Sequence, residues 1–304
     1  MKYIQLLNKD CIQGMQELAN NSIDCVIADP PYDIGSINYG GSVNTVKKLN
    51  KSLQDLRKAD LIKGYDIVAF GEEALRVMNE INIYFWCNKK QIPVYFDFYV
   101  NKHKCTFDIL AWHKTNALPT YSNKYLSDTE YLLYFRKGKG KCFPKSYEDA
   151  KTYYVAPINH KDKKLWGHPT IKPLDITEKI IRNSTRGGQT VLDPFSGSGT
   201  TAIACINNNR NFIGFELDKD YYDISLDRIE KETGVRVWNR GGKMKEIEIH
   251  IHGRYVIEIE DNADVVDEVE QSFINMLDYD PDFEIERYEE VKGWTKKILI
   301  DYTN

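Results

Sequence analysis

The alternation of short apolar runs with helical patterns along residues 3–230 most constrains the fold of this chain. The predicted helices cover 66–79, 93–103, 173–184, 200–207 and 221–230, and the predicted strands cover 3–7, 81–86, 106–112, 130–135, 189–192 and 211–215. Strands that alternate with helices favour a mostly parallel sheet with helices on both faces. The sequence therefore predicts an α/β fold for the larger part of the chain.

A buried strand is predicted at residues 23–28, and it ends abruptly in Asp29-Pro30-Pro31-Tyr32. Two consecutive prolines remove two backbone donors and fix φ, so the strand cannot continue beyond them. The tetrapeptide presents a carboxylate, two carbonyls and an aromatic ring, which suit a flat ring that carries an amino group. The alternative is a strand that simply stops at two prolines, followed by a surface tyrosine.

A second motif, T-V-L-D-P-F-S-G-S-G-T-T at residues 190–201, joins a predicted strand to a predicted helix. Gly197 and Gly199 permit tight backbone angles and let a ligand approach the main chain. The next strand ends in Glu216, about 20 residues after Gly197, where a carboxylate can accept hydrogen bonds from ribose hydroxyls. Because Ala202 completes a dinucleotide fingerprint, NAD remains a competing ligand, and a turn without any ligand remains the third interpretation.

Together, D-P-P-Y and D-P-F-S-G-S-G-T resemble the amino-methyltransferases of DNA, which transfer a methyl group from S-adenosylmethionine to adenine N6 or cytosine N4. Because the catalytic motif comes first and the cofactor motif late, the order is similar to that of their circularly permuted β group. Further blocks match in order: L-L-N-K-D-C, W-H-K-T-N, E-Y-L-L-Y-F-R-K-G-K, H-P-T-I-K-P-L and R-N-F-I-G-F-E-L-D. The resemblance implies a Rossmann-like S-adenosylmethionine-dependent methyltransferase fold over about three-quarters of the chain, up to residue 232.

The resemblance also implies which residues hold the cofactor. The expected set is Asp10, Cys11, Asp29, Thr170, Lys172, Pro173, Asp193, Phe195, Gly197, Ser198, Gly199, Thr200 and Glu216. The glycine-turn residues would surround the methionine part, Glu216 would bind the ribose, and Asp10 with Cys11 would border the adenine. Two alternatives stay open, since Asp10 suits a plain helix N-cap and Lys172 a surface charge.

The implied catalytic residues are Asp29, Pro30, Pro31 and Tyr32. Acceptors on Asp29 and the Pro30 carbonyl would bond the amino group and expose its lone pair for direct in-line attack. The base would have to flip out of the duplex, with Tyr32 as its stacking partner. In the resembled group, Asp at the first motif position goes mostly with adenine and Ser with cytosine N4.

Three other functions remain under consideration. An N4-cytosine or RNA methyltransferase would use the same acceptors, and a non-catalytic DNA-binding protein could retain the same fold. A nucleotide-dependent oxidoreductase would explain the glycine turn but not Asp29-Pro30-Pro31-Tyr32. The chain contains no Pro-Cys pair, which argues against the covalent route used for C5 of cytosine.

Charge divides the chain into two unlike parts. Residues 243–304 contain 7 basic and 17 acidic residues, a net charge of −10, which leaves the rest of the chain at +6. We therefore expect a catalytic domain at 1–240 that binds double-stranded DNA, and an acidic α+β appendage at 243–304. The appendage is expected to contain a hairpin around Gly253 and a helix at 263–277, and to contact a second copy or another protein. Within the catalytic domain, the basic and aromatic segment 139–167 is predicted to recognise the target, helped by a flap at 33–65.

The sequence contains no apolar run near the ~20 residues that span a bilayer, and its first residues do not resemble a signal peptide. Six scattered cysteines lack metal-ligand spacing, so no metal site is expected. These observations predict a cytoplasmic protein of bacterial, archaeal or phage type.

Overall fold

The computed structural model describes residues 3–31, 65–117, 119, 125–138, 141–167, 170–235 and 237, and the backbone of the strands between 244 and 301. The chain divides into two compact units, Met1–Val237 and Trp238–Asn304. Tyr32, nearly all of the expected flap 33–65 and the expected helix 263–277 lie outside the described residues.

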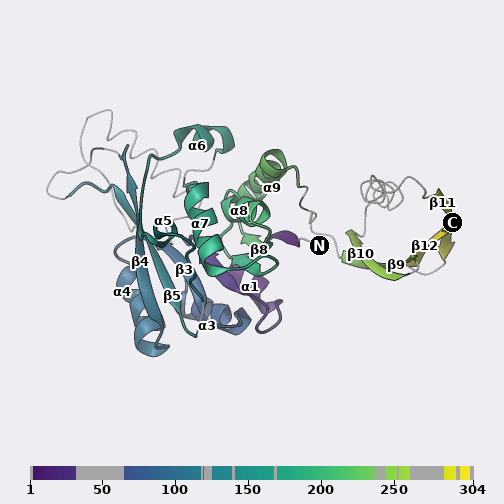
Figure 1. Cartoon of the computed structure of the whole chain (residues 1–304), viewed down its shortest axis with the longest axis horizontal. Coiled ribbons are helices and arrows are strands. Elements are labelled where there is room, and N and C mark those ends of the chain that lie inside the picture. Colours follow the sequence, from purple (N-terminus) through teal and green to yellow (C-terminus); the bar gives the residue numbers. More distant parts are fainter. Residues whose placement is uncertain are drawn as a thin grey trace. The chain divides into compact units, whose positions relative to one another are not determined.

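The first unit is built on one mixed sheet (Figure 1). Its strands are β1 (Ile4–Asn8), β2 (Cys25–Ala28), β3 (Asn82–Cys87), β4 (Thr106–Lys114), β5 (Thr129–Arg136), β6 (Tyr153–Ala156), β7 (Thr190–Asp193) and β8 (Asn211–Glu216). Their spatial order is β1-β8-β7-β2-β3-β5-β4-β6. All neighbours pair in parallel except β5, which is antiparallel to both β3 and β4. The sheet is thus mostly parallel, as predicted.

Helices cover both faces of this sheet. They are α1 (Cys11–Gln16), α3 (Ile67–Val77), α4 (Ile92–Tyr95), the π-helix η1 (Phe96–Lys102), α5 (Tyr147–Ala150), α6 (His160–Trp166), α7 (Leu174–Ser184), α8 (Thr200–Asn207) and α9 (Lys219–Thr233). Side chains alternate along each buried strand, so β2 sends Cys25 and Ile27 toward one core and Val26 and Ala28 toward the other. The first core packs against α7, α8 and α9, and the second against α1, α3, α4 and η1.

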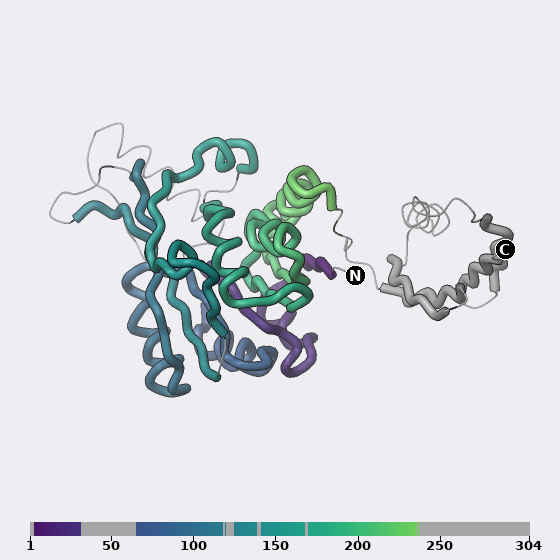
Figure 2. The backbone as a smooth tube through the Cα atoms, viewed as in Figure 1, coloured from purple at the N-terminus to yellow at the C-terminus, as the bar shows by residue number. Residues whose placement is uncertain are grey.

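The sheet brings together segments that are far apart in the sequence. Figure 2 shows the first strand beside β8, and the register pairs Leu7 with Phe215 and Asn8 with Glu216. Likewise β2 lies between β7 and β3, so that Val26 pairs with Leu192 on one side and Ile83 on the other. The carboxyl ends of β2, β7 and β8 therefore meet at one edge of the sheet.

One prediction for this unit needs correction. The helix expected at 93–103 is a short α-helix, α4, that continues as the π-helix η1. The segment 139–167, where the periodicity is weak, contains α5, β6 and α6, and β6 adds a strand beside β4. α5 and β6 have only four residues each, which is too short for a periodic pattern to stand out in the sequence.

The second unit contains a four-stranded sheet in the order β10-β9-β12-β11. Its strands are β9 (Met244–Ile251), β10 (Gly253–Glu260), β11 (Glu284–Val291) and β12 (Thr295–Asp301). β9 and β10 pair antiparallel from Gly253↔Ile251 onward, which is the hairpin expected around Gly253. Among the described residues of the chain, no helix is long and apolar enough to cross a membrane.

Candidate active site

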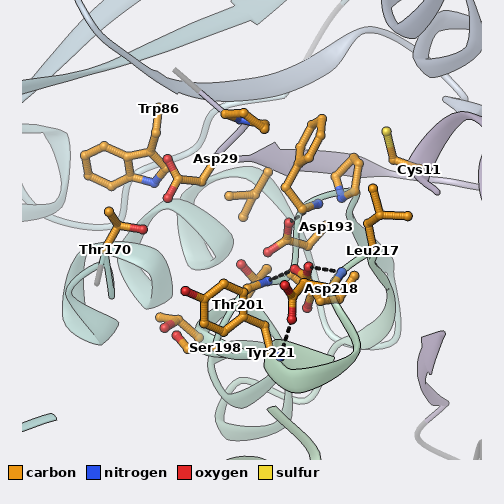
Figure 3. A pocket seen from close by; sticks show the side chains of 18 of the residues that line it. Cys11, Asp29, Trp86, Thr170, Asp193, Ser198, Thr201, Leu217, Asp218 and Tyr221 are labelled. Atoms are coloured by element: carbon orange, nitrogen blue, oxygen red, sulfur yellow. Dashed lines mark hydrogen bonds between the residues drawn. The ribbon is translucent and has the colours of Figure 1, made fainter. Parts of the chain in front are cut away.

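A pocket of about 610 Å³ opens at the carboxyl edge of the parallel strands. β1, β2, β7 and β8 lead to Asp10, Asp29, Asp193 and Glu216, and all four of these acidic residues line the pocket. Figure 3 shows two of them, Asp29 and Asp193. In open α/β sheets, ligands bind in the crevice outside the carboxyl ends of the strands. The pocket is therefore the candidate active site of this fold.

The glycine turn after β7 forms one wall of this pocket. Gly197 and Gly199 have φ values of 53° and 77°, which a residue with a side chain adopts only with strain. The turn is tied to β8, because the Gly197 N–H donates a 2.7 Å hydrogen bond to Oε2 of Glu216. The other carboxylate oxygen, Oε1, accepts from the Asp218 N–H at 2.9 Å. One side chain thus fixes both loops.

Burial changes the acid strength of the two carboxyl groups on this wall. Asp193 is 4% exposed, and desolvation raises its pKa to about 7, although hydrogen bonds from Thr201 and the Phe195 N–H oppose the shift. Desolvation also raises the pKa of Glu216. Both groups are held where a ligand with hydrogen-bond donors or positive charge would favour their ionised forms.

Asp29, directly after β2, also lines the pocket and is paired with a buried lysine. Nζ of Lys172 lies 2.6 Å from Oδ2 of Asp29 and 5.3 Å from the ring centre of Trp86. Lys172 is only 8% exposed, so its interpretation as a surface charge is wrong. Burial alone would lower the pKa of Lys172. The carboxylates of Asp29 and Glu130 oppose this effect and hold the pKa above its ordinary value.

Behind this ion pair the charges continue into the sheet. Nζ of Lys172 also lies 3.4 Å from Oε2 of Glu130, at the start of β5, and Glu130 pairs with Lys114 at the end of β4. Burial alone would raise the pKa of Glu130, but the two ammonium groups lower it to about 2. Two carboxylates and two ammonium groups thus alternate from Asp29 to Lys114.

Most of the residues expected to bind cofactor line the pocket. They are Asp10, Cys11, Asp29, Thr170, Lys172, Asp193, Phe195, Gly197, Ser198, Thr200 and Glu216, and Pro31 lines it as well. Pro30, Pro173 and Gly199 do not contribute to the lining. Pro173 is the N-cap of α7, and a Cβ on Gly199 would lie 3.2 Å from Ile229 of α9, so both belong to the supporting structure. Asp10 caps α1, since its Oδ1 accepts from Ile12 and Gln13, and it lines the pocket too.

Several lining residues escaped the sequence analysis. Trp86, Tyr65, Asp66, Asp218 and Tyr221 all line the pocket. A usable signal existed for two of them, because Asp66 is the first residue of one predicted helix and Asp218 lies three residues before another, and each caps its helix. Tyr65 is held by a 2.7 Å hydrogen bond between its hydroxyl and that of Tyr95. Nothing in its neighbourhood in the sequence indicates that contact.

Comparison with known proteins agrees with this geometry. The family model described as DNA methylase, of the N6/N4 type, matches residues 23–227. The Type II methyltransferase M2.DpnII of Streptococcus pneumoniae is 30% identical over 250 residues, which cover 75% of this chain and 90% of that protein. M2.MboI of Moraxella bovis is 27% identical over 250 residues, covering 77% of this chain and 90% of its own length.

Among solved structures, that of M1.HpyAVI superposes with a TM-score of 0.52 at 26% identity, covering 74% of this chain and 98% of that one. The cytosine-N4-specific PvuII DNA methyltransferase superposes with a TM-score of 0.55 at 15% identity, covering 76% and 93%, and this likeness shows the fold. The fold, the pocket at its carboxyl edge and the family match over 23–227 agree: the chain belongs to the N6/N4 family of DNA methylases.

Proposed function

We propose that this protein transfers a methyl group from S-adenosylmethionine to the exocyclic N6 of adenine in double-stranded DNA. The observation that carries the proposal is the position of Asp29, which lines the same pocket as the glycine turn and Glu216. An acceptor for the target amino group and a wall for the methyl donor thus face one space. The solved complex of M1.HpyAVI with S-adenosylmethionine, a chain 28% identical to this one with a TM-score of 0.50, supports the choice of donor.

The lining of the pocket fits S-adenosylmethionine better than a dinucleotide. Its charged lining residues are Lys9 and Lys172 on the basic side and Asp10, Asp29, Asp66, Asp193, Glu216 and Asp218 on the acidic side. This acidic excess would repel a pyrophosphate but attract a cationic sulfonium and ammonium group. The Glu216 and Asp218 carboxylates suit the donors of a ribose, and Phe195 offers an aromatic surface. NAD is therefore disfavoured.

When bound, S-adenosylmethionine supplies an electrophilic methyl group on its sulfonium. The protein's own contribution is to position and polarise the amino group. The Asp29 carboxylate accepts a hydrogen bond from the amino group, which frees the nitrogen lone pair for in-line attack. Pro30, whose carbonyl the sequence assigned to the second N–H, is buried and does not line the pocket. A proton leaves after the transfer, and Asp29 is the acceptor in reach. Tyr32, which lies outside the described residues, would stack on the flipped base.

The choice of adenine rests on Asp29 at the first position of the tetrapeptide, since the acceptor geometry serves cytosine N4 equally. Mass spectrometry of nucleosides from DNA treated with the protein and S-adenosylmethionine would decide between the two bases. N6-methyladenine is expected, and N4-methylcytosine as the sole product would overturn the adenine assignment. Unchanged methyl transfer by an Asp29→Ala variant would overturn the mechanism itself.

The chain order, with Asp29 before the glycine turn, also supports placement in the circularly permuted β group.

We further propose that segment 139–167 contacts the DNA target. The rings of Tyr147 and Tyr153 are 81% and 51% exposed, and Nζ of Lys151 lies 5.3 and 5.8 Å from their centres. Exposed rings beside a cation suit stacking on bases and contact with phosphate. A Tyr147→Ala, Tyr153→Ala double variant should bind specific DNA more weakly while it retains its affinity for S-adenosylmethionine. Equal DNA affinity would refute the assignment.

The acidic unit from residue 243 onward is proposed to contact a second copy of the chain or another protein, because DNA would repel its net charge of −10. Size-exclusion chromatography with light scattering, applied to the full chain and to a chain ending at residue 242, would test this role. A smaller assembly is expected for the shortened chain. An unchanged assembly together with lost DNA binding would contradict the proposal.

A further inference from the structure

Two lysine–tryptophan stacks stand side by side next to Asp29. Nζ of Lys172 lies 5.3 Å from the ring centre of Trp86, and Nζ of Lys114 lies 5.1 Å from that of Trp112. The two indole rings contact each other edge to face, with their centres 6.4 Å apart. Both ammonium groups are therefore held in fixed places over aromatic rings, and Figure 3 shows Trp86 beside Asp29 on the same wall of the pocket.

Glu130 lies between the two ammonium groups. Its Oε1 pairs with Lys114, and its Oε2, which is shielded from solvent, lies 3.4 Å from Nζ of Lys172. Lys172 in turn lies 2.6 Å from Oδ2 of Asp29, so one ammonium is shared unequally by two carboxylates. Lys114 and Lys172 expose only 13% and 8% of their side chains, and solvent therefore screens these charges little.

We propose that Glu130 and Lys114 are positioning residues for methyl transfer, which set how strongly Lys172 binds the Asp29 carboxylate. These four charges sum to zero, and a fifth group, the Lys163 ammonium, interacts electrostatically with all four of them. Without Glu130, Lys114 would repel Lys172 toward Asp29. The Asp29 carboxylate would then be neutralised more strongly by the Lys172 ammonium, which makes it a weaker acceptor for the target amino group. Without Lys114, Glu130 would draw Lys172 away, and the Asp29 carboxylate would lose its orientation. The inference rests on the proposed role of Asp29.

The test compares Glu130→Gln, Lys114→Gln and the double variant with the full-length wild type. Single-turnover rates of methyl transfer to DNA and the Kd for S-adenosylmethionine are measured for each, with thermal unfolding to report on folding. Each single variant should slow the transfer by about 30-fold and change the cofactor Kd little. The double variant removes one charge of each sign, so the net charge of the cluster equals that of wild type, and its rate should return to within about fivefold of wild type.

Because the double variant also relieves the buried unpaired charge that each single variant leaves, thermal unfolding and the cofactor Kd separate positioning from a purely structural role. A single variant that transfers slowly while it melts and binds S-adenosylmethionine as wild type does supports positioning. A double variant as slow as the slower single variant, or slower, would overturn the proposal, and so would singles at the wild-type rate. If a single variant fails to fold, the double variant is compared with wild type, and a rate more than about fivefold below wild type overturns the proposal. The matched control is Glu72→Gln with Lys102→Gln, an ion pair with both side chains half exposed, and it should leave the rate unchanged.

An Asp29→Ala variant distinguishes this proposal from the proposed function. If Asp29→Ala retains the wild-type rate, the proposed role of Asp29 fails, and with it the basis of this inference. If Asp29→Ala is inactive while Glu130→Gln and Lys114→Gln are as fast as wild type, only the positioning role fails.

Discussion

The N–H of Gly197 and the carboxylate of Glu216 meet at 2.7 Å, which links the glycine turn after β7 to the end of β8. The same carboxylate accepts from the Asp218 N–H, so its two oxygens fix the loops on either side. Both loops line the pocket. Glu216 therefore shapes the site before any ligand enters it, besides offering an acceptor to one.

Replacing Glu216 with Ala should weaken binding of S-adenosylmethionine roughly tenfold to hundredfold, because charge-assisted hydrogen bonds contribute about 1.5–3 kcal/mol. Isothermal titration calorimetry on the full chain would measure the effect. Asp223→Ala, on the exposed side of α9, is the control and should bind as wild type. Equal affinity for wild type and Glu216→Ala would show that Glu216 does not serve the cofactor.

Asp193→Asn should stabilise the ligand-free protein in a pH-dependent way. Burial raises the Asp193 pKa from 3.8 to about 7, so between these values the folded protein binds a proton that the unfolded chain has lost. The free-energy cost of burying the ionised Asp193 carboxylate is thus absent below about pH 4. It grows as the pH rises and is complete above about pH 7. At pH 8 the variant should melt about 4 °C or more above wild type.

Differential scanning calorimetry between pH 4.5 and 8.5 would test this expectation, with the exposed Asp97→Asn as control. The difference in Tm should shrink toward acidic pH. A difference that is constant across the range would mean that burial of the charge is not its cause.

Gly14→Ala should destabilise the fold by about 1–3 kcal/mol through overpacking. A Cβ at Gly14, in α1, would lie 2.4 Å from Cε1 of Phe215, whose ring is fully buried beside Glu216. This cost outweighs the gain of up to about 1 kcal/mol from replacing a helical glycine with alanine. Urea unfolding would measure it. At Gly187, where the nearest atom would be 3.9 Å away, the same substitution should be within about 0.5 kcal/mol of neutral.

Alkylation should distinguish the pocket cysteine from the exposed one. Cys142 is exposed, whereas Cys11 is buried and desolvation raises its pKa to about 12, which leaves almost no thiolate at pH 8. Iodoacetamide at pH 8 should modify Cys142 first and spare Cys11, as read by peptide mass spectrometry. Early modification of Cys11 would contradict the burial of this wall of the pocket.

The sequence was most informative where the polypeptide is regular. Periodicity predicted β7, α8 and β8 within a residue or two, and parallel pairing then required Asp29, Asp193 and Glu216 to share one edge. The contact of Lys172 with Asp29 and Glu130 could not be predicted, because it depends on where the irregular segment before α7 places Lys172 and on the antiparallel placement of β5. Trp86 reads as an ordinary buried strand residue, and only the position of Lys172 above its ring gives it a place in the site.

The strand order has a consequence for how the protein is made. β1 pairs with β8 alone, and β8 and β7 separate it from β2. A ribosome that has released only the first half of the chain has produced β1 to β5, of which β2, β3, β5 and β4 are neighbours in the sheet, whereas β1 still lacks the two strands that join it to β2. The pocket can close only after residue 216 emerges, and such long-range pairing folds slowly. Methyl-transfer activity is thus withheld from the nascent chain until nearly the whole first unit has been synthesised.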